Sequence, residues 1–146
     1  MVIIKEGSLL EAEEDILIHQ VNVDGLMGAG IAKQFAEQYQ GLENYYSEYC
    51  KRRNYDYKKL RGEVCFYLTE DKKVIANIFS QDKNFNTDYE ALKMCLEKVR
   101  KNADINNLTM ALPFKIGCGI ANGDWEIVSE IINKAFKDDS INIYKL

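Results

Sequence analysis

The sequence predicts a single α/β domain whose strands pair mainly in parallel. Short apolar runs rich in β-branched residues alternate with longer stretches of helical periodicity, which is typical of strands joined by crossover helices. At 146 residues, 47% of them hydrophobic and 29% charged, the chain is long enough to bury a sizeable core. No internal repeat or linker interrupts the pattern, so we expect one domain over residues 1–146.

The first half of the chain predicts two strands, two helices and two more strands. These elements are expected at residues 2–5, 15–21, 29–39, 42–53, 62–70 and 73–79. The second strand is apolar on both faces, as in a buried parallel strand. The first helix places Ile31, Ala32, Phe35 and Ala36 on one face, and Gly41 is its expected stop. The last two strands are joined by a short connection, so we expect them to be antiparallel neighbours.

The second half predicts a helix, a strand, a helix and a final strand. They are expected at residues 87–103, 108–114, 125–137 and 141–146. Thr87 and Asp88 are candidate caps of the first of these helices, and Glu90 stands at capping-box spacing from Thr87. Asp124 is the expected cap of the second helix.

Charge and cysteine usage exclude several classes of protein. A net charge of −4 disfavours a nonspecific nucleic-acid binder, which needs a basic face. The basic run at 51–61 is interpreted as a solvated helix end and loop. The start of the chain lacks a signal-peptide pattern and no apolar run approaches a membrane span, so we expect a cytoplasmic protein without a membrane partner. We also expect a monomer. The four cysteines form no C-x-x-C pair, so we expect buried, reduced thiols and no metal.

Two glycine-rich segments each fall between a predicted strand and a predicted helix. The first, HQVNVDGLMGAGIAKQF, contains Gly25, Gly28 and Gly30, and the second is IGCGIANGD. Backbone N–H groups at such helix entrances bind anions, and two loops together suit a diphosphate. Neither a dinucleotide fingerprint nor a P-loop is present, so hydride transfer and ATP hydrolysis are not favoured. The alternative is that these glycines serve only tight turns and close packing.

Three motifs resemble the macro domain family. They are LIHQVNVDGLMGAGIAKQF, PFKIGCGIANGDW and the C-terminal IYKL, and they are most similar to the branch with an ADP-ribose protein glycohydrolase and a yeast ADP-ribose 1''-phosphate phosphatase. The resemblance implies a mixed sheet of about six strands between helices. It also implies a cleft that binds ADP-ribose without a metal or redox cofactor.

The resemblance carries over to individual positions. It places the first phosphate and distal-ribose loop at Gly28–Ile31, the second diphosphate loop at Gly117–Ile120, and the adenine between Tyr144 and Leu146. The full set of implied ligand contacts is Ser8, Leu9, Asn22, Met27, Gly28, Ala29, Gly30, Ile31, Ser80, Gln81, Pro113, Ile116, Gly117, Cys118, Gly119, Ile120, Tyr144 and Leu146.

Three positions depart from the family pattern. Ser8 follows Gly7 where most members carry an acid that binds the adenine amino group. Gln81 and Ala121 stand where the glycohydrolase of this branch has a lysine and an aspartate. A covalent route through that lysine is therefore not expected.

The candidate catalytic residues are His19, Asn22 and Asp24. His19 is the one side chain whose ordinary pKa lies near neutrality, and it is a candidate general base or water-positioning group. Asn22 and Asp24 are expected to orient the ribose hydroxyls or the water. The alternatives are a buried, inert His19 and an Asx turn at Asp24.

Three functions remain open from the sequence. The first is a hydrolase of ADP-ribose derivatives substituted on the distal ribose, namely the 1''-phosphate, the O-acetyl ester or an ADP-ribosyl ester. The second is a non-catalytic ADP-ribose reader. The third is a glycohydrolase that removes ADP-ribose from protein or nucleic acid. The expected partners are ADP-ribose or a derivative and ADP-ribosylated protein, and nucleic acid is not expected.

Overall fold

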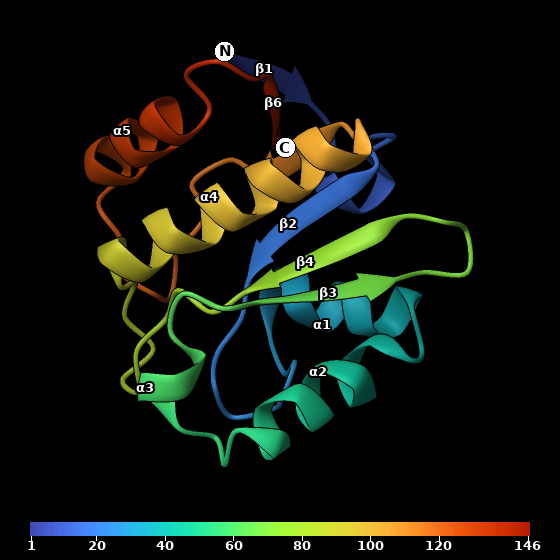
Figure 1. Cartoon of the computed structure of the whole chain (residues 1–146), viewed down its shortest axis with the longest axis vertical. Coiled ribbons are helices and arrows are strands. Elements are labelled where there is room, and N and C mark those ends of the chain that lie inside the picture. Colours follow the sequence, from blue (N-terminus) through green and yellow to red (C-terminus); the bar gives the residue numbers. More distant parts are fainter.

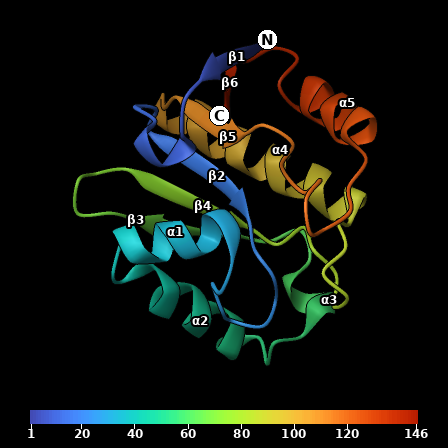
Figure 2. The same cartoon turned by 180° about the vertical axis from the view of Figure 1, so that it is seen from behind.

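A six-stranded mixed sheet forms the centre of the molecule. The computed structural model describes residues 1–146, and its sheet has the strand order β1-β6-β5-β2-β4-β3 (Figures 1 and 2). All neighbouring strands are parallel except β3 and β4, which are antiparallel. The strands are β1 (Val2–Glu6), β2 (Ile16–Gln20), β3 (Val64–Leu68), β4 (Val74–Ile78), β5 (Met110–Pro113) and β6 (Ile141–Lys145). The predicted α/β sandwich, with its antiparallel pair, is confirmed.

Helices cover both faces of the sheet. Figures 1 and 2 show α4 and α5 on one face, and α1 and α2 on the other. The helical elements are the 3₁₀ turn η1 (Leu9–Glu11), α1 (Gly30–Gln38), α2 (Leu42–Arg52), α3 (Tyr57–Leu60), α4 (Tyr89–Asn106) and α5 (Trp125–Ala135). No helix of the structure is both long and apolar enough to cross a membrane.

Two apolar cores lie on opposite faces of the sheet, and β2 contributes to both. Ile16 and Ile18 join the core under α4 and α5, while Leu17 joins the core under α1 and α2. Alternate side chains of a strand point to opposite faces, so a strand with consecutive apolar residues must be covered on both sides. The continuous apolar run of β2 thus explains its central place in the sheet.

Several local features differ from the sequence prediction. Gly41 does not end α1, because α1 is capped at Tyr39 and Gly41 begins α2 with an ordinary right-handed conformation. The capping box at Thr87 is also absent: Asp88 caps α4, its side chain accepting from the Ala91 N–H. Asp124 caps α5 as predicted. The short helices η1 and α3 carry too few residues for any periodicity to reveal them.

Candidate functional site

A continuous groove crosses the carboxyl ends of the central strands. It consists of three adjoining cavities, which we name the Tyr144 cavity (about 300 Å³), the central cavity (about 340 Å³) and the Asn22 cavity (about 420 Å³). Ile31 and Pro113 line both the Tyr144 and the central cavity. Ala29 and Gln81 line both the central and the Asn22 cavity. The groove is therefore one elongated site rather than three separate hollows.

Two glycines of this groove have no reason within the fold to be glycine. A Cβ atom added at Gly28 or Gly119 would meet nothing within 4 Å, and neither residue has a positive φ. Their backbone N–H groups, and those of Ala29 and Ile120, donate to no backbone carbonyl. Ala29 also offers no side chain to cap α1, so the first N–H groups of that helix stay open. The two loops thus present bare donors to the groove, as an anion site requires.

A chain of polar contacts holds the second loop in place. The Ser80 hydroxyl donates to Gln20 Oε1 (2.6 Å), Gln20 Nε2 donates to Thr87 Oγ1 (3.3 Å), and the Thr87 hydroxyl donates to the Gly117 carbonyl (2.6 Å). Gly117 has φ +73°, and an added Cβ would lie 2.7 Å from Thr87 Oγ1. Unlike Gly28 and Gly119, this glycine is required by the fold itself.

His19 lies under the central cavity and is 1% exposed. Its Nε2 is 2.6 Å from Asn77 Oδ1, and because Asn77 Nδ2 donates to the Cys65 carbonyl, Nε2 is the protonated ring nitrogen. The ring also contacts the edge of Phe35, with centroids 5.0 Å apart. Burial lowers the pKa of His19 to about 4, so the imidazole is neutral at neutral pH. The second ring nitrogen, Nδ1, is buried without a partner and out of reach of water, which favours the packing interpretation over the general base.

Asn22 and Asp24 lie together in the Asn22 cavity. Asn22 Oδ1 accepts from the Asp24 N–H (3.0 Å) and from the Tyr46 hydroxyl (2.5 Å), and its Nδ2 donates to the Leu26 carbonyl (3.0 Å). The amide therefore braces the first loop. The Asx turn is thus formed by Asn22 and not by Asp24, where it was expected. The Asp24 carboxylate is exposed and is the only charged side chain that lines this cavity.

The Tyr144 cavity has apolar and aromatic walls but no acidic side chain. Its apolar and aromatic lining residues include Leu9, Phe114, Tyr144 and Leu146, and its charged residues are Lys115 and Lys145. Ser8 also lines it, but the serine Oγ accepts from the Leu10 N–H (3.2 Å) and caps η1. The serine hydroxyl is thus already engaged in the turn that forms the cavity wall.

Most of the predicted contacts come together in this groove, and three do not. Met27, Ser80 and Cys118 line none of the three cavities. The Met27 side chain is buried in the core under α1 and α2, and Ser80 is 0% exposed beneath Gln20. Cys118 packs against the opposite core. The ligand contacts at these three positions stay predictions.

An apolar rim, which no sequence pattern predicts as a unit, surrounds the mouth of the Asn22 cavity. It consists of Leu26, Phe85 and Ile120, which are 64%, 43% and 79% exposed. Phe85 has φ +64°, an uncommon conformation for a bulky residue, at the tip of a loop closed by the Gln81–Thr87 bridge. Strained residues gather at functional sites. The isolated phenylalanine in the polar segment KNFNTD is the one sequence signal that could have found it.

Comparisons with known proteins, by sequence and by structure, all indicate the same family. The Macro domain family model matches residues 18–132. The chain is 30% identical over 137 residues to the ADP-ribose glycohydrolase OARD1 of Bos taurus, covering 92% of this chain and 84% of that protein. It is 26% identical over 159 residues to the ADP-ribose 1''-phosphate phosphatase of Debaryomyces hansenii, covering 88% and 87%. The macrodomain of Mycobacterium tuberculosis DarG superposes with a TM-score of 0.86 at 27% identity, covering 100% and 98%. The matched residues include both glycine loops.

Proposed function

Because this chain belongs to the macro domain family, we propose that its groove binds ADP-ribose and that the protein hydrolyses ester derivatives substituted on the distal ribose. The names of its relatives support a ligand of this kind, since the Bos taurus and Debaryomyces hansenii proteins are named for ADP-ribose and its 1''-phosphate. The observation that carries the proposal is the pair of open glycines, Gly28 and Gly119, across one continuous groove.

The groove accommodates the ligand in three segments. The diphosphate lies in the central cavity between the two loops, where unpaired N–H groups and the α1 N-terminus offset its charge. The adenine occupies the Tyr144 cavity, whose aromatic and apolar walls suit a base. The distal ribose then lies in the Asn22 cavity, and its substituent leaves through the apolar rim.

The rim favours an ester over a phosphate on the distal ribose. The Asn22 cavity is lined by no lysine or arginine, and its only charged side chain is the Asp24 carboxylate. A phosphate group there would carry its negative charge beside Asp24 without a compensating cation. An acyl group would instead cover the exposed side chains of Leu26, Phe85 and Ile120.

In this proposal Asp24, whose exposed carboxylate lines the Asn22 cavity, acts as the general base. It accepts a proton from water as the water oxygen attacks the ester carbonyl carbon. Backbone N–H groups of the first loop stabilise the negative charge that develops on the carbonyl oxygen. The ester C–O bond then breaks, the proton passes to the ribose oxygen, and the products are a carboxylic acid and ADP-ribose. Neutral His19 forms part of the floor of the groove.

Replacing Asp24 tests the reaction. For Asp24→Asn we expect kcat on O-acetyl-ADP-ribose to fall about 10²- to 10⁴-fold, while calorimetry shows unchanged affinity for ADP-ribose. Asp56→Asn is the matched control, because Asp56 caps α3 outside the groove and asparagine can still accept from the Lys58 N–H. An unchanged kcat in Asp24→Asn would remove this carboxylate from the reaction. Faster turnover of the 1''-phosphate than of the ester by the wild type would contradict the choice of substrate.

A second function, a reader that binds ADP-ribose without turnover, is favoured by one specific observation. Gln81 and Ala121 both line the central cavity and supply neither the amine nor the carboxylate that the glycohydrolase branch carries there. Micromolar ADP-ribose binding combined with no turnover of the 1''-phosphate, the acetyl ester, or ADP-ribosylated protein and DNA would establish the reader and exclude the hydrolase.

A further inference from the structure

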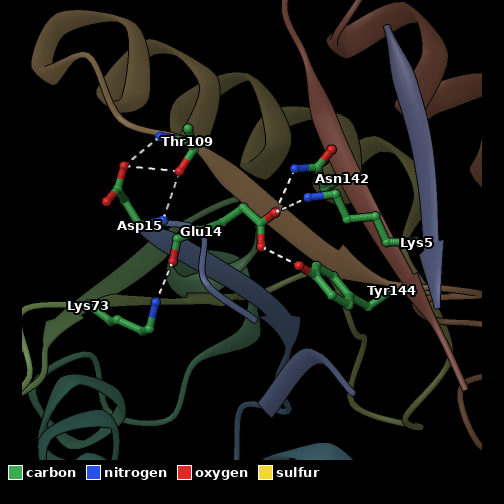
Figure 3. Close-up of polar contacts among 7 residues, drawn as sticks. All are labelled: Lys5, Glu14, Asp15, Lys73, Thr109, Asn142 and Tyr144. Carbon is green, nitrogen blue, oxygen red and sulfur yellow. Dashed lines mark hydrogen bonds and ion pairs between the residues drawn. The ribbon is translucent and has the colours of Figure 1, made fainter. Parts of the chain in front are cut away.

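A buried carboxylate outside the groove converges with three side chains from the sheet edge. Glu14 is 6% exposed and precedes β2, and Figure 3 shows Lys5, Asn142 and Tyr144 pointing toward it from β1 and β6. Asn142 and Tyr144 are two residues apart, so they share one face of β6, and Lys5 lies opposite Tyr144 in the parallel register. Three positions on one face of two strands are thus tied to a single carboxylate.

Each oxygen of Glu14 is engaged. Oε1 accepts from the Tyr144 hydroxyl (2.7 Å), while Oε2 accepts from Asn142 Nδ2 (2.6 Å) and from Lys5 Nζ (3.2 Å). These hydrogen bonds outweigh the cost of burial, so that the pKa of Glu14 is lowered although desolvation alone would raise it. Burial and the adjacent carboxylate raise the pKa of Tyr144 to about 12, which keeps its hydroxyl protonated as a donor. The contact is therefore a charge-assisted hydrogen bond.

The Tyr144 ring links this carboxylate to the groove. Its hydroxyl is anchored by Glu14, and a Cβ on Gly7 would lie 3.7 Å from Tyr144 Cδ2, so the ring packs close to the backbone after β1. The ring also lines the Tyr144 cavity. The Glu14 carboxylate fixes the tyrosine hydroxyl and the backbone near Gly7 limits the movement of the ring. The ring is therefore held in the orientation that forms the cavity wall.

We propose that Glu14 is a positioning residue for base recognition, which it serves by fixing the Tyr144 ring as a wall of the Tyr144 cavity. This inference rests on the proposed binding of ADP-ribose in the groove. Because no acidic side chain lines the Tyr144 cavity, the base is held there through ring contact and shape. The orientation of the tyrosine ring then determines a large share of the affinity for the base.

Two probes distinguish positioning from general stability. ADP-ribose carries the base and is measured by calorimetry, whereas ribose 5-phosphate lacks it and is measured by NMR titration. For Glu14→Leu and Tyr144→Phe we expect the Kd of ADP-ribose to rise about five- to tenfold, with the Kd of ribose 5-phosphate changed less than about twofold. Glu14→Gln should stay near the wild type, because a tyrosine hydroxyl can donate to or accept from an amide.

Thr109→Val provides the matched control. The Thr109 hydroxyl donates to the side chain of Asp15, the residue that follows Glu14 (Oγ1 to Oδ2, 3.0 Å). It makes no hydrogen bond with Tyr144 (Figure 3). We expect this variant to lose stability but to bind both probes as the wild type does. If Glu14→Leu fails to fold, Tyr144→Phe, which removes one oxygen atom, carries the test.

The outcomes separate the two proposals. Wild-type affinity for ADP-ribose in Glu14→Leu or Tyr144→Phe, or an equal loss for both probes, would overturn the positioning role and leave the proposed function standing. No binding of ADP-ribose by the wild type would overturn both.

Discussion

His19 shows how one residue at the centre of a site can serve the fold more than the chemistry. Its Nε2 donates to Asn77 Oδ1, its ring packs on Phe35, and its Nδ1 has no partner within the protein. Burial without a partner for the second nitrogen disfavours the imidazolium. The residue therefore makes the stability of the molecule depend on pH.

The sign of this dependence follows from the lowered pKa of His19. The unfolded chain takes up a proton near pH 6.5, but the folded chain does so only near pH 4, so acid favours unfolding over that interval. Between pH 7 and pH 5 we expect the free energy of unfolding, measured with urea, to fall by about 2 kcal/mol. This is the only histidine, and Glu14 and Asp88, whose pKa values are lowered, bind protons mainly below this range. His19→Gln should lack the decrease, and a wild type equally stable at both pH values would contradict the assignment.

At the scale of elements, the two glycine loops contain glycines of two kinds: some are expected to be needed for the ligand, and another is needed for folding. Gly28 and Gly119 have free space where a side chain would stand, whereas Gly117 has a left-handed backbone against Thr87. The same substitution therefore has opposite consequences in neighbouring positions.

Alanine substitutions measure that difference. For Gly28→Ala and Gly119→Ala we expect an unfolding free energy that is unchanged or raised by up to about 1 kcal/mol, because alanine restricts the unfolded chain. The affinity for ADP-ribose should fall at least about tenfold, because the methyl group occupies the anion cradle. Gly117→Ala is the comparison and should lose about 1–3 kcal/mol of stability. Unchanged ADP-ribose affinity in both Gly28→Ala and Gly119→Ala would show that these two glycines are not required for binding the anion.

Periodicity explains which elements could be predicted from the sequence. The continuous apolar run of β2 and the amphipathic helices leave few alternatives, so the order and layers of the fold follow from them. The helix α3 has only four residues and begins at the Asp56 cap, so it is too short to show a helical periodicity in the sequence. The contact of Thr87 with Gly117 joins two segments far apart in the chain, and no local pattern encodes it. Likewise, β2 is apolar on both faces, so its sequence has no polar–apolar alternation that would assign His19 to a buried or an exposed face.

At the scale of the whole molecule, the proposed ligand joins the two ends of the chain and both glycine loops. Residues near Ser8 and Leu146 line one end of the groove, and Asp24 and Phe85 line the other. A ligand that binds only this folded arrangement must stabilise the molecule as a unit.

Thermal unfolding tests this linkage. At an ADP-ribose concentration of about 100 times Kd, the folded state gains about 2.7 kcal/mol, which corresponds to a rise in Tm of roughly 5–10 °C for a domain of this size. Gly28→Ala at the same ADP-ribose concentration should show at most about half that rise, because a tenfold weaker affinity leaves a gain of about 1.4 kcal/mol. An unchanged wild-type Tm in calorimetry would contradict binding to the native groove.

The pairing of β1 with β6 has a consequence for how the groove assembles. β1 is an edge strand whose only neighbour is β6, so Val2, near the start of the sequence, pairs with Ile141, near its end. Closing so long a loop is entropically costly, and such contacts form late in folding. An edge held by one neighbour is also the first part of a sheet to open in the native state. We therefore expect the cavity bounded by Gly7 and Tyr144 to form late in folding and to open readily in the native state.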